Sequence, residues 1–159
     1  MNFGLSPLPA DSSSLTLVVR QTIQATAEFL FDAWTQPVRL KEWWGPSGVK
    51  CVDAQIDLRI GGKYRIANQL ADGKIIWITG IYEHIEVPHK LVYTWCVERA
   101  SGPIERVTVE FAPRDRETEV IVTHERITDP RVRDQHEAGW RGCLDGLIEY
   151  AILRATEAH

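Results

Sequence analysis

Two histidines and one cysteine are the side chains whose chemistry stands out first. His124 falls on one face of an alternating strand pattern, whereas His136 and Cys143 share a face of a helical pattern. A histidine that faces a domain interior can titrate near neutral pH and can donate or accept a hydrogen bond. His124 is therefore the candidate polar contact for a ligand. A core imidazole, satisfied by Tyr93 or by a backbone carbonyl, is the equally weighted alternative.

Nucleophilic catalysis and metal binding find less support. Cys143 could pair with His136 or His124, but no nucleophile motif is present, and a buried cysteine is commonly an inert hydrophobe. Metal ligation is disfavoured because the pairs His124-Glu125 and His136-Glu137 each point adjacent side chains in different directions. We therefore assign no catalytic residue, no metal ligand and no cofactor.

Composition and charge restrict the classes of partner. The chain has 159 residues, 44% of them hydrophobic, and a formal net charge of −4 with acidic and basic residues interspersed. This balance favours neither nucleic acid nor an anionic membrane surface, and the apolar runs are too short for membrane insertion. The cysteines Cys51, Cys96 and Cys143 are far apart and form no CxxC pair. We expect reduced thiols and a cytoplasmic protein.

The elements that must position these side chains follow from periodicity. Residues 1–14 mix Pro, Ser and Gly without a period, which predicts a disordered lead-in. A strand is expected from Leu15, followed by a short helix capped by Thr26 and a second short helix that begins at Pro37. From Val49 to Ile127 the pattern is that of further strands separated by turn signals.

After Asp129-Pro130 the pattern becomes helical, with an apolar stripe at spacings of three and four residues. The stripe consists of Val132, His136, Trp140, Cys143, Leu144, Leu147 and Ala151. Neither this stripe nor one face of an antiparallel sheet can be buried alone, so the two should pack together. The prediction is a single α+β domain over residues 15–157, in which a seven-stranded curved antiparallel sheet wraps around a long C-terminal helix.

Four local motifs occur in register with this order of elements. They are Trp43 to Pro46 (WWGP), Asp57 to Tyr64 (DLRIGGKY), Leu91 to Trp95 (LVYTW), and Gly139-Trp140 followed by Leu144 to Leu147 (LDGL). Over about residues 15–155 the chain resembles the family of proteins related to the C-terminal domain of the activator of Hsp90 ATPase. That family belongs to the START-like, Bet v 1-like superfamily. The resemblance implies a helix-grip fold with an apolar cavity between the sheet and the long helix.

Strand alternation combined with this fold assigns side chains to the expected pocket. Those predicted to line it are mostly aromatic or apolar: Tyr64, Ile66, Ile78, Tyr82, Tyr93, Trp95, Val109, Phe111, Val122, His124, His136, Trp140, Cys143 and Leu144. Trp43 and Trp44 are expected at the lid or entrance. Without the resemblance, plain core packing would be the preferred interpretation of the same residues.

The resemblance implies no single activity, since relatives in the superfamily include lipid carriers, hormone receptors and polyketide cyclases. The leading prediction is a non-enzymatic module that binds an apolar, aromatic or lipid-like small molecule. A protein-interaction role such as chaperone association is the first alternative, and apolar residues such as Val92 and Cys96 exposed on the outer face would favour it. An enzyme of cyclase or hydratase type that uses His124 is the second. Monomer and homodimer stay equally open.

Overall fold

The computed structural model describes residues 14–46, 48–100 and 102–157, which form seven strands and three helices. The predicted lead-in, residues 1–14, lies outside the described residues except for Ser14. In chain order the elements are β2 (Leu15–Ile23), α2 (Ala27–Thr35), α3 (Pro37–Trp43), β3 (Lys50–Ile56), β4 (Lys63–Gln69), β5 (Ile75–Glu86), β6 (Lys90–Val97), β7 (Glu105–Arg114), β8 (Glu117–Ile127) and α4 (Pro130–Glu157). The predicted order of elements is confirmed.

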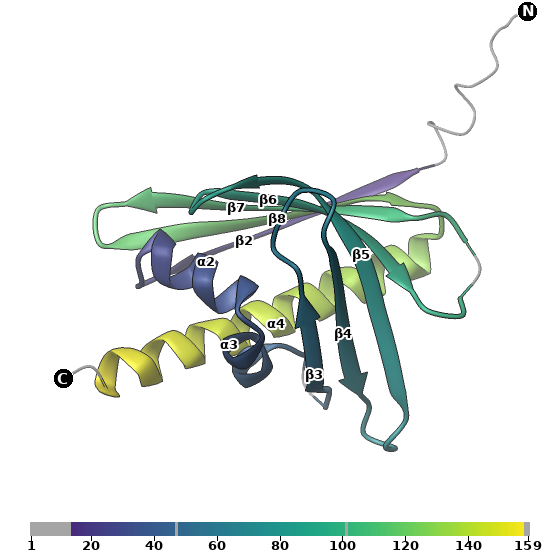
Figure 1. Ribbon diagram of the computed structural model, residues 1–159, viewed down its shortest axis with the longest axis horizontal. Coiled ribbons are helices and arrows are strands. Elements are labelled where there is room, and N and C mark those ends of the chain that lie inside the picture. The colour runs from purple at the N-terminus through teal and green to yellow at the C-terminus, as the bar shows by residue number, and fades with distance from the viewer. Residues whose placement is uncertain (1–13, 47, 101, 158–159) are drawn as a thin grey trace, which may run out of the picture.

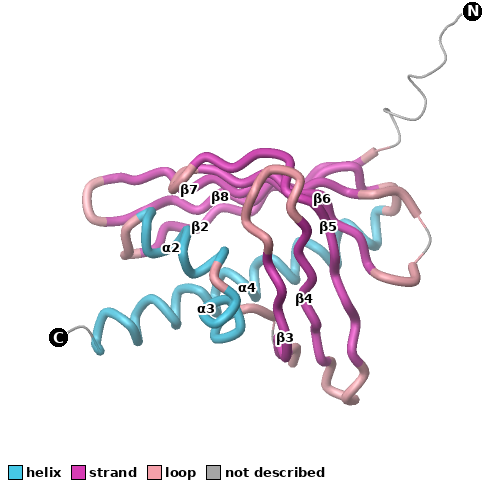
Figure 2. Tube along the Cα trace, in the orientation of Figure 1, coloured by secondary structure: helices cyan, strands magenta, loops and turns pink. Residues whose placement is uncertain are grey.

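The strands form one antiparallel sheet in the order β2-β8-β7-β6-β5-β4-β3. Bulges interrupt the register in β2, β3 and β5, and such irregularities bend a sheet. Figure 1 shows α4 crossing the inner side of this curved sheet, and Figure 2 shows α2 and α3 on the same side. The predicted helix-grip architecture is therefore confirmed.

Local chemistry explains where the two short helices begin. The Thr26 side chain accepts a hydrogen bond of 3.0 Å from the Phe29 amide, so it satisfies one of the free N–H groups at the start of α2. Pro37 occupies the first turn of α3, where its missing N–H costs nothing. Because α3 packs on β3 and α2 packs on β7, these helices cover part of the inner face that α4 leaves open.

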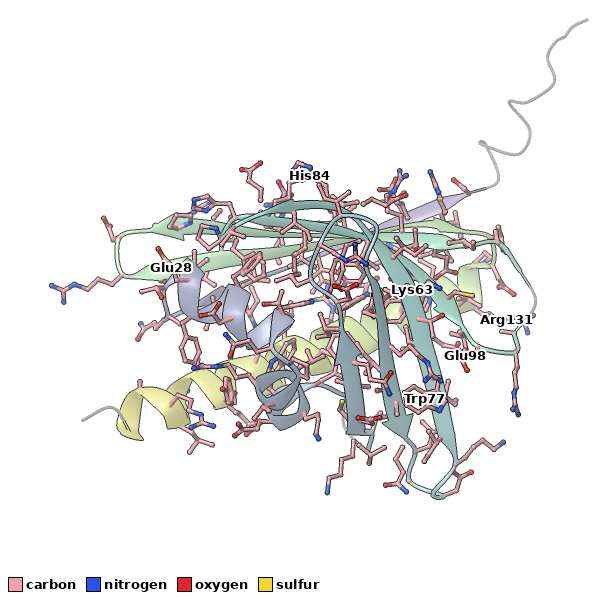
Figure 3. The ribbon with its side chains drawn as sticks, in the orientation of Figure 1. Glu28, Lys63, Trp77, His84, Glu98 and Arg131 are labelled. Carbon is pink, nitrogen blue, oxygen red and sulfur yellow. The ribbon has the colours of Figure 1, made fainter. Side chains whose placement is uncertain are left out.

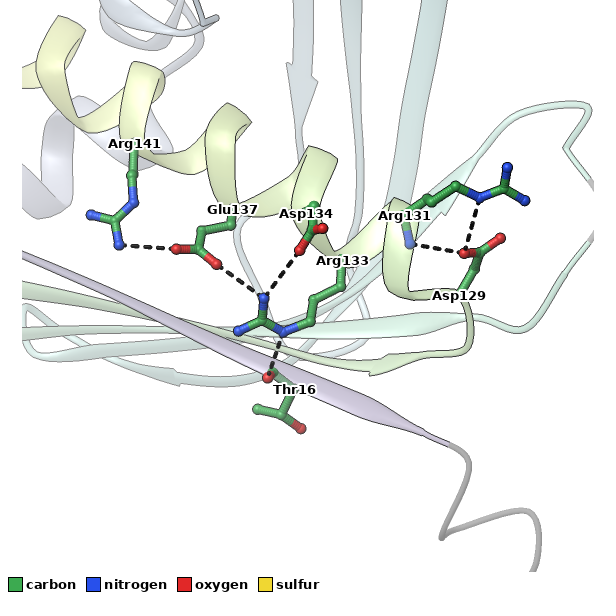
Figure 4. A network of polar contacts seen from close by, with 7 residues as sticks. All are labelled: Thr16, Asp129, Arg131, Arg133, Asp134, Glu137 and Arg141. Carbon is green, nitrogen blue, oxygen red and sulfur yellow. Dashed lines mark hydrogen bonds and ion pairs between the residues drawn. The ribbon is translucent and has the colours of Figure 1, made fainter.

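The long helix α4 packs mainly on β2 and β8, at one edge of the sheet. Figure 4 shows how charged residues fasten its first turns there: Arg133 donates to the Thr16 carbonyl on β2 and pairs with Glu137. Glu137 also pairs with Arg141, and these two arginines lower the pKa of its carboxyl group. Glu137 therefore faces away from the interior, in a different direction from its neighbour His136, as adjacent helical residues must.

The outer face of the sheet is predominantly polar. Figure 3 labels Lys63, Trp77 and Glu98 among the side chains that lie on the outside of the molecule. The guanidinium of Arg65 lies over the Trp77 ring at 4.0 Å from its centroid and pairs with Glu98 at 3.2 Å. This cation–π contact accounts for the half-buried Trp77 on the outer face.

Candidate functional site

A cavity of about 200 Å³ opens between α4 and the β4–β6 part of the sheet. It exists because α4 packs on β2 and β8 and stands away from the strands at the opposite edge. We call it the tryptophan cavity after three of its lining residues. Its lining consists of Trp44, Pro46, Val49, Asn68, Leu70, Ile76, Ile78, Trp95, Val97, Gln135, His136, Gly139, Trp140 and Cys143.

The three tryptophans of the cavity contact one another. The ring centroids of Trp44 and Trp140 are 5.5 Å apart and nearly perpendicular, and those of Trp95 and Trp140 are also 5.5 Å apart. Edge-to-face and tilted arrangements of this kind are favourable because a ring edge is positive and a ring face negative. The Trp44 indole nitrogen donates to the Asn68 side-chain oxygen at 3.0 Å. The wall is thus held in place by its own contacts.

A chain of hydrogen bonds lies behind this wall. The Trp140 indole nitrogen donates to Nδ1 of His124 at 3.0 Å, and Nε2 of His124 lies 2.7 Å from Oε1 of Glu105. Nε2 of His136 lies 2.9 Å from the same oxygen, and the two imidazole rings stack with centroids 4.2 Å apart. We call these four residues the Glu105 network.

Trp140 determines the proton arrangement in the network. An indole N–H can only donate, so Nδ1 of His124 must present its lone pair, and the ring proton must sit on Nε2. That proton is then donated to Glu105, which also accepts from His136. A second proton on His124 would put two donors face to face. His124 is therefore held as the neutral tautomer.

The pKa directions agree with this arrangement. Burial lowers the pKa of His124, although Glu105 acts in the opposite direction, because the charged imidazolium loses hydration. Burial also acts to raise the pKa of Glu105, but the hydrogen bonds from His124 and His136 outweigh it and lower that pKa to about 2. At neutral pH Glu105 is a carboxylate with two ring N–H donors.

The set of Glu105, His124 and His136 has the composition of a two-histidine, one-carboxylate metal site, with its ligand atoms within 4.8 Å of one another. The proton arrangement does not fit that role. A metal ion would need a lone pair on Nε2 of His124, and a neutral imidazole that already presents its lone pair to Trp140 has none left. The network is better described as a fixed hydrogen-bonded support for the cavity wall.

A family model described as "Activator of Hsp90 ATPase homolog 1-like protein" matches residues 24–151. The chain belongs to this family. The resemblance seen in the sequence motifs is therefore confirmed. A search of curated proteins found no match.

Several solved structures share the fold. A protein from Chromobacterium violaceum superimposes with a TM-score of 0.79 and 23% identity, and the match covers 86% of this chain and 96% of that one. A family member from Silicibacter pomeroyi has a TM-score of 0.79 and 22% identity, covering 88% and 99%. An HSP90 activator from Plasmodium falciparum has a TM-score of 0.67 and 25% identity, covering 84% and 93%.

Part of the predicted pocket is packed core instead of cavity. Tyr64, Tyr82 and Tyr93, which we call the tyrosine cluster, lie with Ile66 around a void of only about 10 Å³, beneath Trp34 and Leu40 of the short helices. The Tyr64 hydroxyl donates to the Thr94 carbonyl at 2.6 Å, and the Tyr93 hydroxyl accepts from the Trp34 indole at 3.3 Å. Burial raises the pKa of all three phenols, so each stays neutral. These four residues therefore surround a nearly filled space, and their expected role as ligand contacts stays a prediction.

The remaining predicted residues divide between wall and core. Five line the tryptophan cavity: Ile78, Trp95, His136, Trp140 and Cys143. Others belong to the buried core and do not line that cavity: Val109, Phe111, Val122 and Leu144. His124 is fully buried behind the wall, and its partners are Trp140 and Glu105, where the sequence suggested Tyr93 or a carbonyl.

The two residues expected at the lid, Trp43 and Trp44, lie in different places. Trp44 lines the cavity and is only 5% exposed, whereas Trp43 lies in the core, where its indole donates to the Ala33 carbonyl at 2.9 Å. The sequence analysis did not identify Asn68 and Glu105 as site residues, although strand alternation places both on an inward face. Asn68 continues the inward face of Tyr64 and Ile66, and Glu105 continues that of Val107.

Within the part of the chain that the structure describes, no helix is both long and apolar enough to cross a membrane.

Proposed function

We propose that this family member is a binding module for a small, largely apolar molecule held in the tryptophan cavity. The observation that carries the proposal is the cavity itself: about 200 Å³ of space walled mostly by apolar and aromatic side chains. An apolar cavity of about 150 Å³ is large enough to hold a benzene-sized guest, so this one has room for a ligand. The few polar groups in the wall would orient that ligand.

The cavity chemistry supports binding more than nucleophilic or acid–base catalysis. Burial raises the pKa of the Cys143 thiol to about 12, so the thiolate nucleophile is scarce at neutral pH. His124 is fully buried behind Trp140 and does not line the cavity, which removes the contact that a cyclase or hydratase mechanism would require of it. His136 is the histidine within reach of a ligand.

The matched variants Gly139→Leu and Gly139→Ala test the proposal. Gly139 lies in α4 on the cavity wall, and a Cβ added there would meet no atom within 4 Å. Leu should therefore grow into the cavity and occupy the ligand's space, whereas Ala should leave most of that space open. We expect aromatic and fatty-acid panels, measured by thermal shift and native mass spectrometry, to give ligands that bind the wild type and Gly139→Ala but not Gly139→Leu. No binding to the wild type by any compound would overturn the proposal.

A protein-interaction role is the second candidate, and one observation favours it. The Plasmodium falciparum structure with 25% identity is an HSP90 activator, and the family description carries the same activity. The apolar residues singled out on the outer face, Val92 and Cys96, are half-buried, which weakens the surface argument for this role. The rate of ATP hydrolysis by purified Hsp90, with and without the chain, distinguishes the candidates: stimulation supports this role, and an unchanged rate rejects it.

The cellular location belongs to the same proposal. Cys51, Cys96 and Cys143 are all free thiols, and two of them are buried. Free thiols suit a reducing compartment, so we place the protein in the cytoplasm. Fractionation of cells that produce the chain, with immunodetection in each fraction, tests that placement.

A further inference from the structure

The side-chain amide of Asn68 leaves two hydrogen-bond donors in the cavity wall. The Trp44 indole N–H can only donate, so the contact of 3.0 Å fixes the amide with its oxygen toward Trp44 and its nitrogen, Nδ2, turned away. Among the described residues, the side-chain polar atoms that are fully covered and lack a hydrogen bond are Trp95 Nε1 and Tyr150 Oη. Nδ2 accepts no partner there either but is not covered in this way, so it has accessible surface on a side chain that lines the tryptophan cavity.

His136 leaves an acceptor in the same wall. Its Nε2 donates to Glu105 at 2.9 Å, so the neutral ring presents a lone pair at Nδ1. Nδ1 makes no hydrogen bond with a described residue and is not among the fully covered atoms, and the His136 side chain is 18% exposed and lines the cavity. The bond to Glu105 and the stack on His124 hold the ring, so this lone pair has a fixed direction.

The tryptophan nitrogens of the wall cannot serve a ligand. Those of Trp44 and Trp140 already donate to Asn68 and His124, and that of Trp95 is fully covered. No lysine or arginine is among the described residues that line the cavity, so the wall does not suit a buried anion. The polar atoms left for a ligand are therefore the donors of Asn68 on β4 and the acceptor of His136 on α4.

We propose that the tryptophan cavity selects an uncharged aromatic hydroxyketone, whose carbonyl oxygen accepts from Asn68 Nδ2 and whose hydroxyl group donates to His136 Nδ1. This inference rests on the proposed binding function and names the class of its ligand. A volume of about 200 Å³ exceeds the roughly 150 Å³ that holds benzene, which corresponds to one or two rings. Asn68 and His136 are then the residues that determine specificity.

Four probes built on one two-ring skeleton test the selection. They are tetralin, which has no polar group; tetralone, which has the carbonyl; tetrahydronaphthol, which has a hydroxyl on the aromatic ring; and hydroxytetralone, which has both. Dissociation constants are measured by calorimetry at about pH 8, where an imidazole is usually neutral. We expect each polar group to raise the affinity of the wild type about 3–10-fold, so that hydroxytetralone binds most tightly.

Two variants assign the two contacts, and each is the control for the other. Asn68→Asp keeps an oxygen for the Trp44 indole but has no amide donors, so the advantage of tetralone over tetralin should disappear while that of tetrahydronaphthol remains. His136→Phe keeps a flat ring without a nitrogen, so the opposite pattern is expected. Because each readout is a ratio of two affinities in one protein, a general loss of affinity does not affect it.

The outcomes separate this inference from the function on which it rests. If none of the probes binds the wild type, the cavity-binding function and the ligand class both fail. If tetralin binds the wild type as tightly as the polar probes do, the binding function stands and the ligand class is overturned. An advantage of tetralone that persists in Asn68→Asp would overturn the contact with Asn68, and an advantage of tetrahydronaphthol that persists in His136→Phe would overturn the contact with His136.

A second measurement covers the case in which Asn68→Asp does not fold. The chain contains two asparagines, Asn2 and Asn68, so Asn2→Asp labelled with ¹⁵N-asparagine gives the side-chain NH₂ signals of Asn68 alone. Tetralone should shift one of these proton signals downfield more than tetralin does, because a new acceptor deshields the proton. Equal shifts from the two probes would reject the hydrogen bond to Asn68.

Discussion

The tyrosine cluster and the tryptophan cavity lie on the same inner face of one sheet, yet one is closed and the other open. Above the tyrosines, Trp34 and Leu40 of the two short helices fill the space and leave about 10 Å³. Beside Trp95, α4 presents Gly139 and the chain after α3 contributes Trp44, and about 200 Å³ remains between them. Aromatic strands do not make a pocket by themselves. The element that covers them decides whether they become core or wall.

Backbone contacts distinguish the two regions in the same way. A Cβ at Gly80, on the β5 strand next to Tyr64, would collide with the Thr94 carbonyl. A Cβ at Gly146, where α4 meets α3, would lie 2.6 Å from the Trp43 carbonyl. At Gly139 a Cβ meets nothing within 4 Å. Glycine therefore permits close packing at the first two positions and leaves space at the third.

Truncation of the tyrosine cluster should have the largest effect on stability. Tyr93 is 4% exposed, and its hydroxyl accepts from the Trp34 indole. We expect Tyr93→Ala to lower the free energy of unfolding by about 3–5 kcal/mol, through lost burial and the cavity left behind. Tyr93→Phe keeps the ring but leaves the Trp34 N–H without its acceptor, so it should lower the free energy of unfolding by about 1–3 kcal/mol. Urea unfolding measures both. A loss below about 1 kcal/mol for Tyr93→Ala would mean that this region is not tightly packed.

Removal of the Glu105 carboxylate tests the support behind the open region. Glu105→Ala leaves the Nε2 protons of His124 and His136 without their acceptor, so we expect a loss of about 1–3 kcal/mol at pH 7. Glu105→Gln keeps a carbonyl acceptor and serves as the matched control with a smaller loss. If Glu105→Ala is as stable as the wild type, the network does not support the wall.

The same carboxyl group predicts a pH dependence. Its pKa is about 2 in the folded protein against a usual value of 4.5, so the unfolded chain binds the proton more readily. Stability from Glu105 is therefore present above about pH 4.5 and is lost as pH falls from there toward 2. The lowered pKa of His124 acts in the same direction below its usual 6.5, because the unfolded imidazole takes up a proton first.

Urea unfolding at a series of pH values from 7 down to 3 measures that dependence. We expect the wild type to lose stability more steeply below about pH 4.5 than Glu105→Gln, which has no carboxyl proton to bind. Parallel curves for the two proteins would show that Glu105 has the same pKa in both states.

Two alanine substitutions in one helix give the sharpest comparison, and one of them has the smallest expected effect. Gly146→Ala forces a methyl group against the Trp43 carbonyl and should cost about 1–3 kcal/mol. Gly139→Ala meets open space and replaces a helix-weakening residue, so it should stabilise by about 0.5–1 kcal/mol. Thermal unfolding of both variants measures these changes. If both substitutions raise the stability, or both lower it, the difference between packed and open regions is contradicted.

Sequence alone determined the order of elements, the inward faces of the strands and the family, because these depend on local periodicity and short motifs. Alternation in β8 put His124 inside, and the helical stripe put His136, Trp140 and Cys143 on one face of α4. Strand alternation also put Asn68 and Glu105 on the inward faces of their strands. A polar residue at the end of a strand is usually solvated, however, so the pattern gave no reason to expect either side chain inside the protein.

Only the tertiary structure decided which inward residues line space and which fill it. That outcome depends on the position of α4 at the β2–β8 edge and on the cover that α2 and α3 provide over the tyrosine cluster. The pairing of Glu105 with two histidines from β8 and α4 was likewise beyond local pattern, since it joins residues brought together by strand register and helix placement. Periodicity in the sequence shows which side chains point inward. Whether those side chains leave a cavity, and which hydrogen-bond partners they have, depends on the elements that pack opposite them.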